Sequence, residues 1–150
     1  MENTKMKALI QRVKKAEVFI DNELYSEIGF GILVLLCVEK GDTKENSSKL
    51  AKKLTSLRIF EDDNEKMNKS ISEVNGEFLV VSQFTLAGDC KKGTRPSFDK
   101  AASPEIAKAL YEDFVTELST YGNPVKTGKF QAMMDISLIN SGPVTFMVEK

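Results

Sequence analysis

The chain has no histidine among its 150 residues. Histidine is the commonest general base in enzymes and a frequent metal ligand, so its absence excludes Ser-His-Asp and Cys-His catalytic sites. Cysteine is scarce as well, with Cys37 in an apolar run and Cys90 in a polar segment. Cysteines in such unlike settings support neither a zinc site nor a disulfide scaffold, and they indicate a reducing compartment.

An excess of charge of one sign is also missing, because the formal net charge is −1 at pH 7. No overall field therefore attracts nucleic acid or a membrane surface. The longest apolar run, Ile32–Val38, is too short to cross a bilayer, and the first residues contain no hydrophobic signal core. A phosphate-binding loop and a dinucleotide-binding fingerprint are absent too. We expect a cytoplasmic protein that does not enter a membrane.

Hydrophobic periodicity predicts an α+β fold with largely antiparallel sheets, because strand patterns dominate and two helical patterns interrupt them irregularly. The length suits a single domain over residues 1–150, with residues 1–5 as a flexible leader. The predicted strands are residues 8–13, 17–20, 24–28, 32–38, 58–60, 71–74, 78–85, 134–138 and 144–149, and the predicted helices are residues 43–57 and a segment from 103–104 to about 121.

Local signals define several of these elements. Asn75-Gly76 predicts a tight hairpin turn between the strands on either side. The run at 32–38 has the continuous apolar character of a strand that is buried on both faces. The residues that recur at every fourth position and predict the buried face of the second helix are Ile106, Leu110, Phe114 and Leu118.

Two polar segments interrupt strands that are otherwise apolar. The stretch Phe78–Leu86 begins as an apolar strand and then places Ser82, Gln83 and Thr85 in line. Such groups, with the backbone N–H groups at a strand end, can hold a polar substrate and face a developing oxyanion. The simpler alternative is that the hydroxyls only satisfy nearby backbone groups. Gly142-Pro143 is likewise an ordinary turn or a special backbone feature, and the residues alone leave both alternatives open.

Together, SQFTL at 82–86 and NSGPVT at 140–145 resemble the paired signatures of the D-aminoacyl-tRNA deacylases, the D-Tyr-tRNA deacylase family. A five-residue motif alone is weak, but the resemblance covers essentially the whole chain after Met6. The further segments that resemble the family, in the same order, are ALIQRV at 8–13, GILVLLCVEKGD at 31–42, RIF at 58–60, KMN at 66–68, RPSF at 95–98, ASPEIAKALYEDF at 102–114 and TGKF at 127–130.

The resemblance implies an enzyme that hydrolyses the ester joining a D-amino acid to the terminal adenosine of tRNA, and that also removes glycine mischarged on tRNA. It implies a homodimer with a barrel-like core that needs no metal or other cofactor. Gly142-Pro143, joined by a cis peptide bond, would act as a chiral gate in the pocket of the opposite subunit. Rigid backbone placed where an L side chain would project rejects that enantiomer by steric clash.

The resemblance also assigns residue roles. The residues that would line the catalytic pocket are Ser82, Gln83, Phe84 and Thr85. We expect the backbone N–H groups of Phe84 and Thr85 to face the oxyanion, while the neighbouring 2′-hydroxyl of the RNA assists the attacking water. Arg12 would help to hold the gate. Phe130 and Met134 would cradle the terminal adenine, because an aromatic ring and a thioether suit a purine face.

Other functions remain as alternatives. A non-catalytic module could bind RNA ends or nucleotides, and an esterase could act on small D-amino esters without tRNA. An inert relative should tolerate decay of the signature motifs, and both motifs are intact here, which favours the deacylase. Lys91, Lys92 and Arg95 either contact tRNA phosphates or belong to a solvated loop, and the sequence leaves this open.

Overall fold

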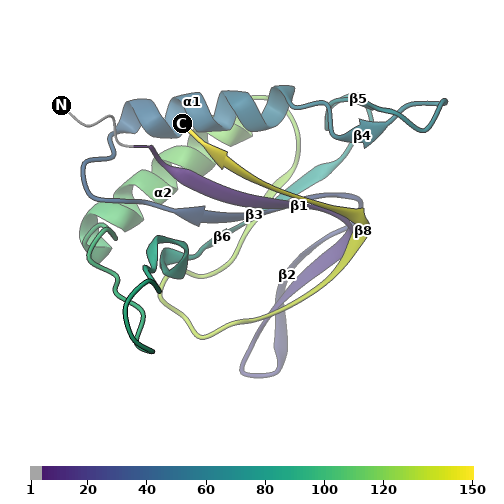
Figure 1. The fold of residues 1–150 in the computed structure, drawn as a ribbon. Helices are drawn as coiled ribbons and strands as arrows, with labels where there is room; N and C mark the ends of the chain where they lie inside the picture. The colour runs from purple at the N-terminus through teal and green to yellow at the C-terminus, as the bar shows by residue number, and fades with distance from the viewer. Residues whose placement is uncertain (1–4) are drawn as a thin grey trace.

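The computed structural model describes residues 5–150, so the expected leader lies outside the described residues except for Lys5. A six-stranded mixed sheet carries both main helices on one face (Figure 1). The elements are β1 (Lys7–Ile20), β2 (Glu23–Ile28), β3 (Gly31–Cys37), α1 (Lys44–Ser56), β4 (Phe60–Glu61), β5 (Met67–Lys69), β6 (Glu77–Ser82), the 3-10 helix η1 (Phe84–Ala87), α2 (Pro104–Ser119), β7 (Val125–Thr127) and β8 (Asp135–Glu149). Neither α1 nor α2 is long and apolar enough to span a membrane.

The sheet is largely antiparallel and almost closes on itself. Its strand order is β2-β1-β3-β6-β7, and β8 pairs with the remaining edge of β1. β1 is antiparallel to β2, β3 and β8, whereas the β3–β6 and β6–β7 pairs are parallel. At the seam between the two ends of this order, Ser26 Oγ donates a hydrogen bond to Thr127 O at 2.7 Å. The predicted α+β fold with a barrel-like core is confirmed.

Apolar residues on the two faces of the sheet form separate clusters. Successive side chains on a strand point to opposite faces, so Ile32 and Val34 of β3 face the helices while Leu33 faces the inside of the curled sheet. β6 alternates in the same way, with Val80 on the helix side and Val81 on the other. The prediction that residues 32–38 form a strand buried on both faces is therefore confirmed for β3.

The second helix begins with Pro104 in its first turn, as predicted, but its expected buried face is partly wrong. Leu110, Phe114 and Leu118 are buried, whereas Ile106 is 53% exposed. An α-helix turns by about 100° per residue, so positions spaced by four drift by about 40° at each step. Tyr111 is buried instead, and this moves the centre of the buried face away from Ile106.

The predicted hairpin at Asn75-Gly76 is wrong. Residues 71–75 form turns, and Gly76 N–H donates to Ile71 O at 2.9 Å. β6 pairs in parallel with β3 on one side and with β7 on the other, so it has no free edge for an antiparallel partner. Ile71 is apolar because it is buried in the helix-side cluster, not because it belongs to a strand.

The two longest strands are each continuous where two shorter strands were predicted. β1 pairs through its first half with β3 and through its second half with β2, while β8 runs along its other edge. The register shifts at two neighbouring places, and at the larger shift the two steps from Gln11 to Val13 face the five steps from Asn140 to Thr145. The extra residues therefore bulge out of the ladder, and this bulge contains Gly142-Pro143.

Candidate active site

The polar segment at 82–85 lies where β6 ends and turns into η1. Gln83 N–H continues the pairing by donating to Leu36 O at 2.7 Å. Phe84 and Thr85 then open η1. The first N–H groups of a helix have no partner within it, so these two donors can bind an oxygen of a ligand. The predicted strand 78–85 is therefore too long, because β6 ends at Ser82. Phe84 and Thr85 lie beyond that end, so pairing within the sheet does not occupy their N–H groups.

Side chains around η1 hold its polar groups in place. Gln83 Nε2 donates a hydrogen bond to Thr85 Oγ1, which leaves the Thr85 hydroxyl proton free to point elsewhere. Gln83 is half-buried and Thr85 is exposed, as a surface pocket requires. The Phe84 ring is 56% exposed and contacts Phe98 edge-on, with centroids 5.2 Å apart.

Cys37 contacts η1 from the buried side, a role that was not predicted from the sequence. Its Sγ donates to Phe84 O at 3.7 Å from the buried end of β3. Burial, followed by the charge of Glu39, raises the pKa of Cys37 to about 11. The group is therefore a protonated thiol at neutral pH and acts as a hydrogen-bond donor rather than a nucleophile.

The second signature segment is held by a buried arginine. Arg12 is 5% exposed and donates from Nε to Ser141 O at 2.9 Å and from Nη1 to Ile59 O at 2.8 Å. Its Nη2 lies 3.4 Å from Glu61 Oε1. Arg12 thus ties the bulge of β8 to β4 and the residue before it, with a planar, five-donor group that a lysine could not replace.

Gly142 occupies a position that only glycine suits. Its φ is +133°, and a Cβ atom there would lie 2.8 Å from Val144 Cγ2 and 2.9 Å from Arg12 Nη2. The Gly142-Pro143 peptide bond is cis, and both residues are exposed at the tip of the bulge. The bulge therefore presents bare backbone to its surroundings.

The two signature segments lie far apart in one chain (Figure 1). Ser82 pairs with Leu36, which in turn pairs with Ala8 of β1. Arg12, beside the bulge, lies about 13 Å further along β1 at strand spacing. The path from β6 to β8 also crosses β3 and β1. One copy of the chain therefore does not bring Gly142-Pro143 next to its own residues 82–85.

The residues expected to cradle adenine pack against different parts of the core. Phe130 packs against the helix-side cluster, with its ring centroid 5.9 Å from that of Tyr111. Met134 packs against the inner cluster. Its Sδ would lie 2.8 Å from a Cβ atom added at Gly128. Both follow β7 on the same connection to β8, but the structure does not bring their side chains onto one surface.

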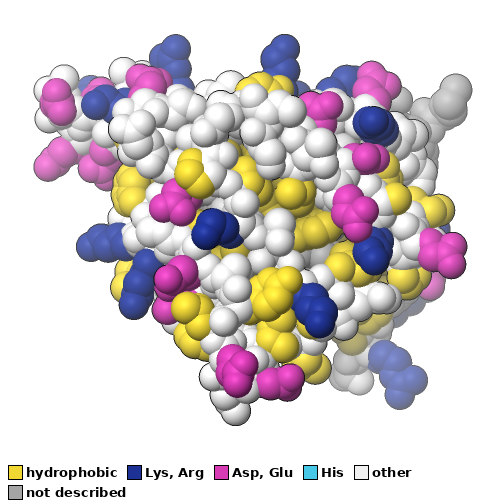
Figure 2. All heavy atoms as spheres, turned by 180° about the vertical axis from the view of Figure 1, so that it is seen from behind, with side chains coloured by type: hydrophobic (Ala, Val, Ile, Leu, Met, Phe, Trp, Pro, Cys, Tyr) yellow, Lys and Arg dark blue, Asp and Glu magenta, His cyan; other side chains and the backbone are white. Residues whose placement is uncertain are grey.

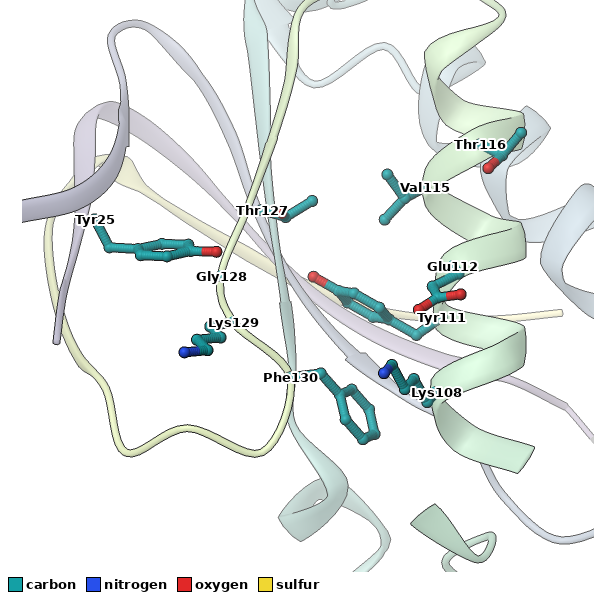
Figure 3. Close-up of a pocket in the computed structure, with 10 residues that line it drawn as sticks. All are labelled: Tyr25, Lys108, Tyr111, Glu112, Val115, Thr116, Thr127, Gly128, Lys129 and Phe130. Carbon is teal, nitrogen blue, oxygen red and sulfur yellow. The ribbon is translucent and has the colours of Figure 1, made fainter. Parts of the chain in front are cut away.

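A cavity of about 600 Å³ opens beside Phe130, between β2, α2 and the residues after β7 (Figure 3). No local sequence pattern indicates this cavity, because its walls come from three distant segments. Tyr111 lies at its base and donates to Val80 O at 2.8 Å. Burial raises the pKa of this tyrosine, so the hydroxyl stays protonated.

A polar loop borders η1 on its exposed side. Phe98 brings this loop to Phe84 through their ring contact. Asp89 and Ser97 pair through two backbone hydrogen bonds of 2.7 and 2.8 Å and close the loop. Its basic residues, which are all exposed, are Lys91, Lys92 and Arg95. Across residues 5–150, no group of three or more Cys, Asp or Glu side chains is arranged to hold a metal ion.

Solved structures share this fold. One, described as "c-Myc DNA Unwinding Element Binding Protein", is 39% identical and superposes with a TM-score of 0.91 over 96% of this chain and 98% of its own. A second, described as "Structural Analysis of a probable eukaryotic D-amino acid tRNA deacylase", has a TM-score of 0.83 over 98% of this chain and all of its own. At 18% identity, the second supports the fold alone. Fold and strand-end segment together define a small α+β protein with a curled mixed sheet and a polar segment where β6 ends.

Sequence comparison identifies the family. A profile described as D-Tyr-tRNA(Tyr) deacylase matches residues 9–149. A protein of Thermodesulfovibrio yellowstonii named D-aminoacyl-tRNA deacylase is 58% identical over 95% of this chain and 98% of its own. One of the same name from Pelobacter propionicus is 57% identical over 97% of this chain and its full length. This chain belongs to the D-Tyr-tRNA(Tyr) deacylase family.

Proposed function

We propose that this chain hydrolyses the ester bond of D-aminoacyl-tRNA and releases the D-amino acid and free tRNA. The observation that carries the proposal is the match to the family over nearly the whole chain, with relatives that bear this name. In the proposed assignment, residues 1–150 form one catalytic domain that acts in the cytoplasm, where charged tRNA is used.

The reaction needs a strong hydrogen-bond donor to the ester oxygen more than a reactive side chain, because an aminoacyl ester is already activated. Water attacks the ester carbonyl, its oxygen forms the new carboxyl group, and the ribose 3′-oxygen leaves with a proton. The N–H groups of Phe84 and Thr85 would stabilise the tetrahedral oxyanion. A donor of this kind contributes about 3–4 kcal/mol in comparable acyl-transfer sites. The neighbouring 2′-hydroxyl of the RNA would assist the water.

The chiral gate in this proposal is Gly142-Pro143 of a second copy. The bulge is exposed and held by Arg12, and it lies far from residues 82–85 of its own chain. In the pocket of the other copy, its backbone would occupy the space that an L side chain needs. Glycine has no side chain to clash, so glycine on tRNA would be accepted, and D side chains of many kinds would be tolerated.

A homodimer follows from this gate. β8 pairs only with β1 among residues 5–150, so its other edge is open. The large apolar side chains exposed along it are Ile139, Phe146 and Met147, each more than 40% exposed. A long edge strand with exposed apolar groups is commonly covered by a partner, and a second copy would cover it here.

The terminal adenosine would lie near the connection between β7 and β8. Phe130 is half-buried beside the cavity of Figure 3 and offers part of its ring as a stacking surface. Met134 would contribute less directly, since it packs into the inner cluster against Gly128. Ser82 and Gln83 would bind the ammonium and carbonyl groups of the amino acid.

A paired deacylation assay tests the proposal. The purified protein is incubated with D-Tyr-tRNA and, separately, with L-Tyr-tRNA at equal concentration. We expect release from the D form only. Hydrolysis of both forms would retain the esterase and refute the gate. Hydrolysis of neither by folded protein would favour a nucleic-acid-binding module, in line with the name of the solved structure that is 39% identical.

A further inference from the structure

The cavity beside Phe130 is larger than the adenosine contact requires. We call it the seam pocket, because it lies where β7 and β2 approach each other on the α2 side. Its volume is about 600 Å³, in the range of small-molecule sites. Its walls, seen in Figure 3, are Tyr25 from β2, Lys108 and Glu112 from α2, and Thr127, Lys129 and Phe130 from the residues at and after the end of β7.

The side chains at the rim match single-stranded nucleic acid. The Tyr25 ring is 50% exposed and stands opposite α2 across the pocket. Lys108 and Lys129 are exposed, and neither joins any ion pair within residues 5–150. Glu112 is the one carboxylate of the lining. Asp21 and Glu23 line the adjoining hollow with Tyr25 and Lys129 but form no ion pair with that lysine. Aromatic rings beside exposed ammonium groups are the combination that binds bases and the phosphates between them.

We propose that the seam pocket binds the nucleotide immediately before the terminal adenosine of the tRNA. This inference rests on the proposed function. Phe130 is both the expected adenine contact and part of the pocket wall, so a nucleotide joined to the adenosine lies within reach of the pocket. Its base stacks on Tyr25, and the phosphate that links it to the adenosine lies beside Lys129.

A series of shortened substrates tests this assignment. D-Tyrosine is esterified to adenosine, to the dinucleotide cytidylyl-adenosine and to tRNA, and kcat/KM is measured for each. We expect the dinucleotide to exceed adenosine by about tenfold, mainly through a lower KM, because one base stack and one phosphate are added. Tyr25→Ala and Lys129→Ala should each remove most of this gain and leave hydrolysis of the adenosine ester unchanged.

Matched variants distinguish loss of the nucleotide subsite from a general loss of activity. Tyr25→Phe keeps the ring and should keep the gain. Lys126→Ala removes an exposed lysine of β7 that does not line the pocket and should behave as wild type. The proposal is overturned if the dinucleotide gains nothing over adenosine, or if both pocket variants retain the full gain. If the wild-type protein hydrolyses none of the three substrates, the proposed function itself is refuted.

Discussion

At the scale of single residues, three residues illustrate how neighbours determine what a group can do. Gly142 is confined by Val144 and Arg12. Thr85 accepts a hydrogen bond from Gln83 and so keeps its own proton for another partner. Cys37 is a thiol kept protonated under η1. Each arrangement leads to a separate prediction.

Gly142→Ala should lower deacylation of D-Tyr-tRNA by about a hundredfold, the cost of misplacing a contact group by about 1 Å. The new Cβ would meet Val144 and Arg12 at under 3.0 Å, so the bulge must shift. Gly122→Ala is the matched control, because Gly122 also has a positive φ, +95°, with nothing within 4 Å of its Cβ position. Equal activity of the two variants would refute the gate.

Thr85→Ala should lower kcat by about tenfold, the value of one neutral hydrogen bond, with the melting temperature unchanged because Thr85 is exposed. Thr55→Ala, which removes a hydroxyl of α1 that bonds to Lys52 O, serves as the control. Unchanged turnover in Thr85→Ala would exclude side-chain chemistry at this position and leave only the backbone N–H.

Cys37 makes folding stability sensitive to high pH. Its pKa is about 11 in the fold against 9.0 for a free thiol. Between these values the unfolded chain binds fewer protons than the folded one, so the stabilisation present below pH 9 is lost as the pH rises to 11. The free energy of unfolding should therefore fall more steeply over this range in the wild type than in Cys37→Ala. Cys90→Ser, at an exposed thiol, should keep the wild-type slope, and equal slopes in all three proteins would contradict the expectation.

At the scale of elements, the sequence predicted those whose signal is local. The N-cap at Thr43 and Pro104 at the start of α2 depend on neighbouring residues, and both helices begin where expected. The predicted hairpin at Asn75-Gly76 is wrong because both edges of β6 pair in parallel with strands that are distant in the sequence. β7 was missed because a strand of three residues has no periodicity to detect.

The loop that borders η1 gives an element-level prediction. If Lys91, Lys92 and Arg95 contact tRNA phosphates, replacing all three with Ala should raise KM and flatten the dependence of log kcat/KM on log salt by about two units. Replacing Lys49, Lys52 and Lys53 on α1 with Ala removes the same charge at another place. An equal effect of the two triple variants would show that the loop makes no specific contact.

At the scale of the whole molecule, the surface agrees with a substrate bound at a local site. The face in Figure 2 carries basic and acidic side chains interspersed with apolar ones, in keeping with a net charge of −1. The net charge supplies no overall attraction for RNA, so in the proposed function recognition would depend on the end of the tRNA and on a few nearby cations.

Mixing two defective variants tests the gate between subunits. In the proposed assignment, Gly142→Ala damages the gate and Thr85→Ala damages the pocket. In a mixed dimer with a cross-subunit gate, one site carries both defects and the other carries neither. Unfolding and refolding the two variants together should therefore restore activity to about a quarter of wild type at statistical exchange. No recovery in a proven mixed dimer would place gate and pocket in the same chain.

The sequence by itself determined the family, the α+β class, the burial of β3 on both faces and the helix starts, because these depend on local patterns or on the order of motifs. Tertiary structure alone decided the parallel pairing of β6 and the position of Arg12 between Ser141 and Ile59. It also separated Gly142-Pro143 from residues 82–85 and formed the seam pocket from three distant segments. Such features arise from contacts between residues far apart in the chain, which no local pattern records.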